Sequence, residues 1–193
     1  VKPNLILTVP LILEKIYKKM ILPQLSKTTM KVALNIPLLD SRIYAQIRKK
    51  LVDAFGGRFR EVIVGGAAMN EEVTNFLYKI KFPFTIGYGM TECGPLISYD
   101  HNDEYVPGSC GQILKGIMKV RIDSEDPYNK VGEIQVSGEN VMKGYYKNEE
   151  ATKAVLDEDG WLHTGDMGTI SADGTIFIKG RSKTMILTSN GQN

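Results

Sequence analysis

The sequence has 193 residues, of which 42% are apolar and 24% charged, and its formal net charge is +2 at pH 7. This length allows one large domain or two smaller ones, and the composition excludes an intrinsically disordered chain. A charge so close to zero gives no electrostatic basis for binding nucleic acid or an anionic membrane. No apolar run approaches the roughly 20 residues of a spanning helix, so we expect no integral membrane segment.

Two cysteines, Cys93 and Cys110, occur in a chain whose first residues do not resemble a signal peptide. The sequence therefore predicts free thiols in a reducing compartment, the cytoplasm. Together with His101 and His163, the cysteines could be considered zinc ligands. Their spacing fits no compact zinc site, so we expect them to have core or surface roles.

The first 100 residues alternate helical and strand-like segments. The earliest helical segment places apolar residues on one stripe, and Pro23 is expected to weaken its continuation. The residues of this stripe are Leu13, Ile16, Tyr17, Met20 and Ile21.

A further helix is predicted at "RIYAQIRKKL", residues 42–51, with Ile43, Ile47 and Leu51 facing inward. The basic residues would form a solvated face. They leave a weak peripheral contact with a membrane open, but they are too few to predict one.

The stretch from residue 61 to residue 89 predicts a strand, a helix and a second strand. Val62–Val64 is a short apolar run typical of a buried strand, and Gly65–Gly66 ends it. Asn70 can cap a helix, and residues 83–89, "PFTIGYG", would be the second strand of a parallel crossover unit. The inward residues of the helix are spaced i, i+3, i+4 and i+7, at Val73, Phe76, Leu77 and Ile80.

After residue 105 the sequence consists of short alternating strands separated by glycines. Asp173–Gly174 predicts a hairpin turn, and one helix is expected at about residues 148–156. The chain therefore divides into an α/β portion, residues 1–105, and a β-rich portion, residues 106–182.

Two glycine stretches follow predicted strands, "VGGAA" at residues 64–68 and "GYGMTE" at residues 87–92. Ligands of open α/β sheets bind at the carboxyl ends of the strands, so both stretches could line one crevice. Taken singly, each is more simply explained as a tight turn.

The residues around the second stretch suit a nucleotide with its metal. A threonine hydroxyl such as that of Thr91 can donate to a phosphate oxygen, the Glu92 carboxylate can hold Mg²⁺, and the Tyr88 ring can stack on a purine. The structural alternatives are a core aromatic at Tyr88 and a solvated turn residue at Glu92.

An acid and a base lie around the predicted hairpin. The Asp166 carboxylate could accept hydrogen bonds from both hydroxyls of a ribose, and Arg181 could reach ribose or phosphate oxygens. A lone aspartate in a turn is more often structural.

Four stretches in this order, "GYGMTE", "VGEIQVSGENVMKGYYKNEEAT", "DGWLHTGDMG" and "IKGRSKTMI", closely resemble the adenylate-forming superfamily of acyl-CoA synthetases, aryl-CoA ligases, peptide synthetase adenylation domains and luciferases. The stretches "GGAAMN" and "FPFTIGYGMTECGPLI" are most similar to those of bacterial long-chain fatty-acid CoA ligases. The resemblance implies the large N-terminal domain of these α/β enzymes. Its architecture would be a partial mixed sheet with flanking helices, followed by a β-rich distorted barrel.

The resemblance also implies roles for individual residues. Thr91 would contact phosphate, Glu92 would hold Mg²⁺, and Asp166 would bind the ribose hydroxyls. Lys183 would be the hinge about which a small C-terminal domain rotates, with residues 183–193 beginning that domain. By similarity, the nucleotide-binding residues are Gly65, Gly66, Ala67, Gly87, Tyr88, Gly89, Met90, Thr91, Asp166, Ile178 and Arg181.

The family's chemistry implies ATP, Mg²⁺, coenzyme A and a fatty acid as ligands. A carboxylate is activated as acyl-AMP and transferred to the thiol of coenzyme A. Charge neutralisation and positioning matter most in the first step, so neither histidine needs a catalytic role. The sequence makes no prediction of oligomeric state.

The sequence departs from the family pattern in two places. Between Val1 and Arg60 nothing matches the Ser/Thr/Gly-rich triphosphate loop, and the chain stops at Asn193, before the position of the family's catalytic lysine. We therefore expect a central portion of a larger enzyme, inactive by itself. The alternatives are a non-enzymatic nucleotide-binding or scaffold module of the same fold, or a ligase for an aryl or amino acid.

Overall fold

The fold was obtained as a computed structural model, which describes residues 2–182. The chain divides into two compact units, Val1–Ile86 with His101–Gly108, and Gly87–Asp100 with Ser109–Asn193. Helices and parallel strands make up the first unit, and antiparallel strands dominate the second. The predicted α/β fold class is confirmed. Within the described residues, no helix is both long and apolar enough to cross a membrane.

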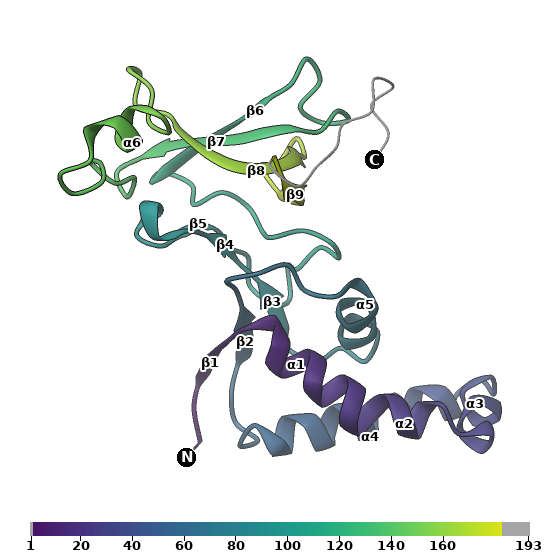
Figure 1. Cartoon of the computed structure of the whole chain (residues 1–193). Helices are drawn as coiled ribbons and strands as arrows, with labels where there is room; N and C mark the ends of the chain where they lie inside the picture. Colours follow the sequence, from purple (N-terminus) through teal and green to yellow (C-terminus); the bar gives the residue numbers. More distant parts are fainter. Residues whose placement is uncertain (1, 183–193) are drawn as a thin grey trace. The chain divides into compact units, whose positions relative to one another are not determined.

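The first unit is built on three parallel strands, β1 (Leu5–Thr8), β2 (Glu61–Val64) and β3 (Phe84–Ile86), in the order β1-β2-β3 (Figure 1). The register pairs Thr8 with Val64 and Val64 with Ile86, so the carboxyl ends of the strands meet at one edge. Central strand β2 is buried, as its apolar run predicted. Edge strand β1 leaves Leu7 75% exposed.

A rod of helical turns follows β1 (Figure 1), made of α1 (Pro10–Ile16), a π-helical turn (Tyr17–Ile21) and α2 (Leu22–Leu25). After the buried Pro10 at its start, its buried positions recur every four residues, at Leu13, Tyr17 and Ile21. The prediction for Met20 was wrong, because this residue is 57% exposed. Pro23 was expected to weaken the continuation of this helix, and the rod ends two residues after it, at Leu25.

Two more helices follow the rod in the chain, α3 (Thr28–Leu34) and α4 (Leu39–Ala54). The predicted inward face of α4 is confirmed. Leu51 is buried, and Ile43 and Ile47 are half-buried.

The crossover helix α5 (Glu71–Lys79) joins β2 to β3 as the sequence predicted. The Asn70 side chain caps it by accepting a hydrogen bond from the Val73 N–H at 3.2 Å. The Tyr17 hydroxyl donates to Glu72 Oε1 at 2.8 Å, which ties the rod to α5. The four predicted inward residues of α5 and its C-cap are all buried, at Val73, Phe76, Leu77 and Ile80.

Residues 101–108 return to the first unit through the buried carboxylate of Glu61, at the start of β2. Glu61 Oε2 accepts hydrogen bonds from the backbone and side-chain nitrogens of Asn102 at 3.1 and 3.2 Å. Its other oxygen lies 3.5 Å from His101 Nδ1. The ring of Tyr105 packs on that of Phe84, with centroids 5.0 Å apart.

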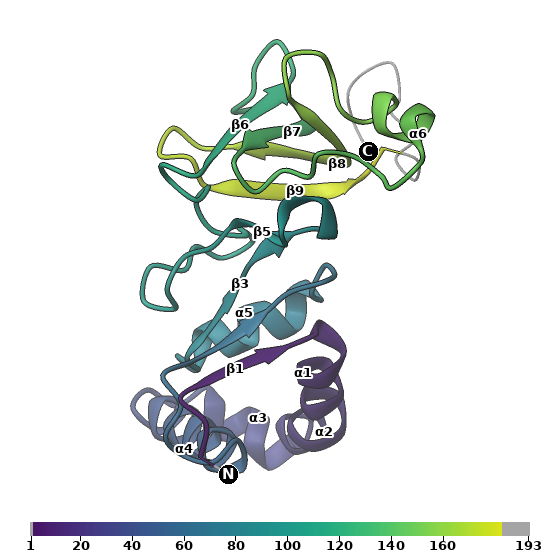
Figure 2. The same cartoon turned by 90° about the vertical axis from the view of Figure 1, so that its left-hand side faces the viewer.

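The second unit contains a four-stranded antiparallel sheet (Figure 2) of β6 (Met118–Asp123), β7 (Gly132–Gly138), β8 (Leu162–Ile170) and β9 (Ile176–Arg181), in chain order. The predicted turn between β8 and β9 is confirmed. Gly174 has a φ of +94°, and its N–H donates to the Ser171 carbonyl at 3.0 Å.

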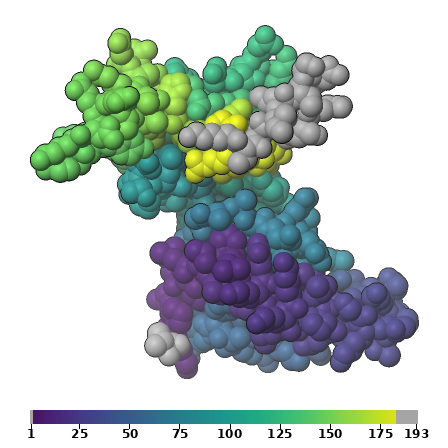
Figure 3. Space-filling model, viewed as in Figure 1, coloured from purple at the N-terminus to yellow at the C-terminus, as the bar shows by residue number. Residues whose placement is uncertain are grey.

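A short helix, α6 (Glu149–Lys153), lies between β7 and β8 and is capped by the Asn148 side chain. It is shorter than the predicted 148–156. The surface view shows the green segment of α6 and the loop before it standing out from this unit (Figure 3).

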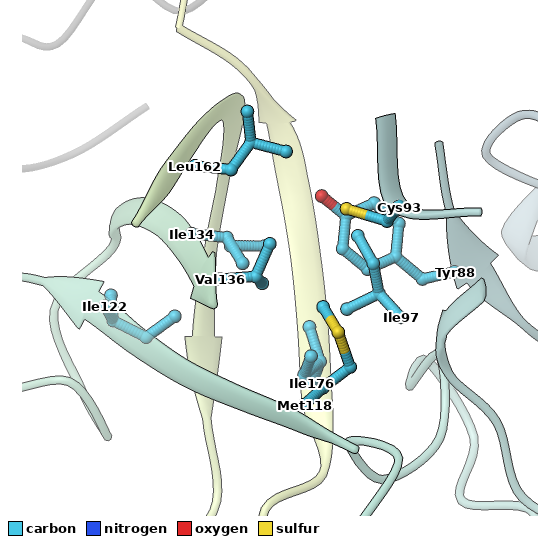
Figure 4. Packing of buried hydrophobic residues seen from close by; sticks show 9 residues of the cluster. All are labelled: Tyr88, Cys93, Ile97, Met118, Ile122, Ile134, Val136, Leu162 and Ile176. Atoms are coloured by element: carbon cyan, nitrogen blue, oxygen red, sulfur yellow. The ribbon is translucent and has the colours of Figure 1, made fainter. Parts of the chain in front are cut away.

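A second, two-stranded sheet is formed by β4 (Tyr88–Gly89) and β5 (Leu96–Ser98). The prediction of one continuous strand over residues 83–89 was wrong, because β3 ends at Ile86 and β4 pairs antiparallel with β5. Apolar side chains from both sheets of this unit share one core (Figure 4). Its members are Tyr88, Cys93, Ile97, Met118, Ile122, Ile134, Val136, Leu162 and Ile176.

We expect Asn70→Ala to lower the free energy of unfolding by about 1 kcal/mol, because the Val73 N–H loses its capping acceptor. Chemical denaturation followed by circular dichroism measures this loss. Asn75→Ala is the matched control, since Asn75 is exposed within the same helix. An equal loss in both variants would contradict the capping role.

Candidate functional site

The turn that carries Thr91 and Glu92 is a single 3₁₀ turn, Thr91–Cys93, between β4 and β5. Gly89, just before it, has no room for a side chain, because a Cβ there would collide with the carbonyl oxygen of Pro95. Glycine at this position therefore lets the two strands close tightly. At the tip of the closed hairpin, Thr91 is exposed and Glu92 is half-buried.

A segment far along the chain holds this turn by its backbone. The Asn140 side-chain amide donates to the carbonyls of Cys93 and Leu96, at 2.7 and 2.8 Å. The Met142 N–H donates to the Glu92 carbonyl at 2.7 Å. Three hydrogen bonds thus fix the backbone of the turn.

One further contact reaches the Glu92 carboxylate itself. The Tyr145 hydroxyl donates to Glu92 Oε1 at 2.8 Å. This bond engages one carboxylate oxygen of a side chain that is half-buried in the turn.

Asp166 lies at the centre of a second cluster in the same unit. Its side chain is 9% exposed, and both carboxylate oxygens have partners. The Tyr88 hydroxyl donates to Oδ2 at 2.8 Å, and Arg181 Nε lies 2.7 Å from Oδ1. Asp166 and Arg181 are cross-strand partners of β8 and β9, whereas Tyr88 comes from β4. The sequence predicted all three residues for one nucleotide site, and the structure brings them together.

Tyr88 belongs to the hydrophobic core of the second unit and is 7% exposed. Burial, with the Asp166 carboxylate beside it, raises the pKa of Tyr88 well above its ordinary value. The phenol therefore keeps its proton and remains a donor to Asp166. In this structure Tyr88 is a packed aromatic, the alternative that the sequence left open beside purine stacking.

The backbone around Asp166 is fixed by polar side chains of β7 and β8. The Asp166 N–H donates to Thr164 Oγ1 at 3.0 Å, and that hydroxyl donates to the Ile134 carbonyl. The Gly165 N–H donates to Glu133 Oε1 at 3.0 Å. These contacts set the direction in which the carboxylate leaves the strand.

The other predicted residues are distributed over the chain. Gly65, Gly66 and Ala67 directly follow β2 in the first unit, and Gly66 has a φ of +89° that favours glycine. In the second unit, Ile178 of β9 packs against the core. Gly87 and Met90 flank β4. Lys183 lies outside the described residues.

The two cysteines and two histidines form no metal site, since residues 2–182 contain no group of three or more metal-binding side chains. His101 contacts Glu61 in the first unit, and His163 Nδ1 lies 2.9 Å from Glu133 Oε2 in the second. Burial raises the pKa of Cys93 to about 11, so its thiol is protonated and a poor nucleophile at neutral pH.

Four residues that support the site were not predicted: Asn140, Tyr145, Thr164 and Glu133. Asn140 and Tyr145 lie 47 and 53 positions from their partners Cys93 and Glu92. No spacing rule connects residues so far apart. The stretch "ENVMKGYY" carries part of the family resemblance, and this was the only available signal for these two residues.

Comparison with known proteins identifies the family of this chain. Residues 1–146 match the family model described as AMP-binding enzyme. The chain is 37% identical over 163 residues to "4-coumarate-CoA ligase 1" of Narcissus pseudonarcissus, covering 78% of this chain and 30% of that protein. The chain therefore belongs to the AMP-binding enzyme family, and it spans about a third of the length of this relative.

Two solved structures resemble the fold. The ATP-bound crystal structure of MatB from Rhodopseudomonas palustris has a TM-score of 0.69 and 27% identity, covering 96% of this chain and 32% of that one. A malonyl-CoA ligase complex with methylmalonyl-CoA and AMP has a TM-score of 0.67 and 27% identity, covering 97% and 36%.

We expect Asn140→Asp to lower the free energy of unfolding by about 1–3 kcal/mol, because a carboxylate would face the two carbonyls that now accept from the Asn140 amide. Urea denaturation measures the change. The matched control is Asn75→Asp on the exposed face of α5, which should be within about 0.5 kcal/mol of the unchanged chain. Two variants of equal stability would show that Asn140 does not hold the turn.

Proposed function

We propose that this chain is the nucleotide-binding portion of an ATP-dependent acid–thiol ligase, which activates a carboxylic acid as acyl-AMP and transfers it to coenzyme A. One observation carries the proposal. Tyr88, Asp166 and Arg181 come together in the unit that also presents Thr91 and Glu92 on a fixed turn. The membership of the family and the ATP and AMP named for its structural neighbours support it.

In this proposal Asp166 binds the ribose. A carboxylate has about four lone-pair sites, so each oxygen can accept a ribose hydroxyl in addition to its present partner. Arg181, whose side chain is 61% exposed, would contact the ribose from the adjacent strand. The buried Tyr88 orients Asp166 through its hydroxyl, and its ring, which is 7% exposed, offers little surface for stacking on adenine.

Thr91 and Glu92 would serve the phosphates and Mg²⁺. The residues fit such a metal, since Mg²⁺ in nucleotide sites is held by one or two carboxylates together with phosphate oxygens and water. Glu92 is one such carboxylate, and only its Oε1 has a hydrogen-bond partner within residues 2–182. When bound, Mg²⁺ would supply positive charge that stabilises the phosphate oxygens. Gly65, Gly66 and Ala67 are proposed for the adenine and acyl pocket, and Lys183 for the hinge.

The reaction has two displacements. A carboxylate oxygen of the acid attacks the α-phosphorus of ATP, a P–O bond forms, and the bond to pyrophosphate breaks. The coenzyme A thiol then loses its proton, attacks the acyl carbon and releases AMP. The chain would bind and orient ATP in the first step and the acyl-adenylate in the second, because positioning and charge neutralisation dominate nucleotidyl transfer and positioning also serves acyl transfer.

The proposal also concerns which carboxylic acid is the substrate. The motif wording favours a long-chain fatty acid, whereas the relative reported above is named for 4-coumarate, an aryl acid. We propose an aryl acid, because a relative matched over 78% of the chain is named for one, and we retain the fatty acid as the competing substrate. A fatty acid would also provide a reason for a weak peripheral membrane contact.

Calorimetric titration with AMP tests the nucleotide site. We expect AMP to bind the chain and Asp166→Asn to weaken binding at least tenfold, since the charged acceptor for the ribose is lost. The matched control is Asp159→Asn, at an exposed position of the same unit, which should bind like the unchanged chain. Equal affinity of all three proteins for AMP would show that Asp166 does not bind the ribose. An absence of binding by the folded, unchanged chain would favour a scaffold module.

Non-hydrolysable acyl-AMP analogues distinguish the acids. If the substrate is aryl, a 4-coumaroyl analogue should bind at least tenfold more tightly than AMP and more tightly than a hexadecanoyl analogue, because the acyl pocket adds buried apolar contacts. The same titration measures all three ligands. Tighter binding of the hexadecanoyl analogue would overturn the aryl proposal in favour of a fatty acid.

A further inference from the structure

The Glu92 carboxylate is held by a phenol that comes from the loop before α6. The Tyr145 hydroxyl donates to Glu92 Oε1 at 2.8 Å, and no other hydrogen bond to this carboxylate occurs within residues 2–182. We propose that Tyr145 is a positioning residue. It fixes the rotation of the Glu92 carboxylate so that Oε2 is directed to the metal of a bound nucleotide. This inference rests on the proposed function.

The phenol can act in this way because the backbone of Tyr145 is itself fixed. Its N–H donates to Thr152 Oγ1 of α6 at 2.9 Å, and its carbonyl accepts from the Asn148 N–H at 3.1 Å. Gly144, just before it, leaves no room for a Cβ, which would lie 2.8 Å from the Thr152 side chain. The hydroxyl is therefore presented from a closely packed loop.

The other end of the contact is equally constrained. The Met142 N–H donates to the Glu92 carbonyl at 2.7 Å, and the Asn140 amide holds the next residue of the turn through the Cys93 carbonyl. Since the backbone of Glu92 is already fixed, little remains for Tyr145 to stabilise except the direction of the side chain. A carboxylate directed in advance loses less freedom when it binds a metal.

The chemistry of the pair suits a lasting contact. A phenol ordinarily has a pKa of about 10, so Tyr145 is a donor at neutral pH and the Glu92 carboxylate is its acceptor. Tyr145 is 38% exposed, so it lies at the surface near the site rather than in the core. A residue in this place contributes less to packing than a buried one, which makes its effect on the metal separable from its effect on folding.

The adjacent Tyr146 provides a matched control. It is 88% exposed, and its ring faces Lys147 Nζ at 5.3 Å. Removal of its hydroxyl is the same chemical change one residue away, with no contact to Glu92.

The test is calorimetric titration of ATP and AMP with Mg²⁺ and with chelator, on the unchanged chain and on Tyr145→Phe, Tyr146→Phe and Glu92→Gln. The quantity compared is the factor by which Mg²⁺ strengthens ATP binding. We expect Tyr145→Phe to reduce this factor by about tenfold, as loss of a residue behind a metal ligand does. Its AMP affinity and unfolding temperature should remain those of the unchanged chain. Glu92→Gln should abolish the factor, and Tyr146→Phe should preserve it.

Three outcomes would overturn the inference, and each has a distinct meaning. A Tyr145→Phe variant with the full Mg²⁺ factor shows that Tyr145 does not position Glu92. A variant that loses AMP affinity and thermal stability together shows a structural role. If the unchanged chain binds AMP but shows no Mg²⁺ factor, Glu92 is not the metal ligand. Failure of the unchanged chain to bind either nucleotide contradicts the proposed function itself.

Discussion

The second unit depends on a buried carboxylate with a partner on each oxygen. Removing a charge from water is costly unless it is paired and hydrogen-bonded, so Asp166 requires both Tyr88 and Arg181. These partners belong to β4 and β9, while Asp166 belongs to β8. The Asp166 carboxylate thus joins the small sheet to the large one, beside the apolar core to which Tyr88 also belongs. The proposed ribose site is therefore also a structural junction.

The Thr91–Cys93 turn likewise needs partners for its polar groups, but here the groups are neutral backbone carbonyls. Its carbonyls would be poorly satisfied at the end of so short a hairpin, and Asn140 and Met142 supply the missing donors. Once the backbone is satisfied in this way, the Glu92 side chain can be committed to a single direction by Tyr145. Support for the proposed metal ligand thus comes from outside its own hairpin, through the segment that the family resemblance also marks.

Local signals predicted the first unit best. The apolar run of β2, the Asn70 cap and the spacing in α5 were each sufficient, because all depend on neighbouring residues. The errors occurred where partners are distant. Met20 fits the helical stripe, but the π-helical turn changes the register and exposes it. Residues 83–89 read as one strand, but Tyr88 pairs with Ser98 in another sheet. The site residues were predicted from motifs, and their roles stay predictions.

By itself, the sequence determined the α/β class, the family and the types of side chain available for a nucleotide site, because composition, periodicity and motif order are properties of the chain alone. Only the tertiary structure decided which of these side chains meet. Tyr88 reaches Asp166 across 78 positions and Tyr145 reaches Glu92 across 53, and such pairings follow from strand register and core packing. Hydrogen bonds act over about 3 Å in space, whatever the separation in sequence, so local patterns carry no information about them.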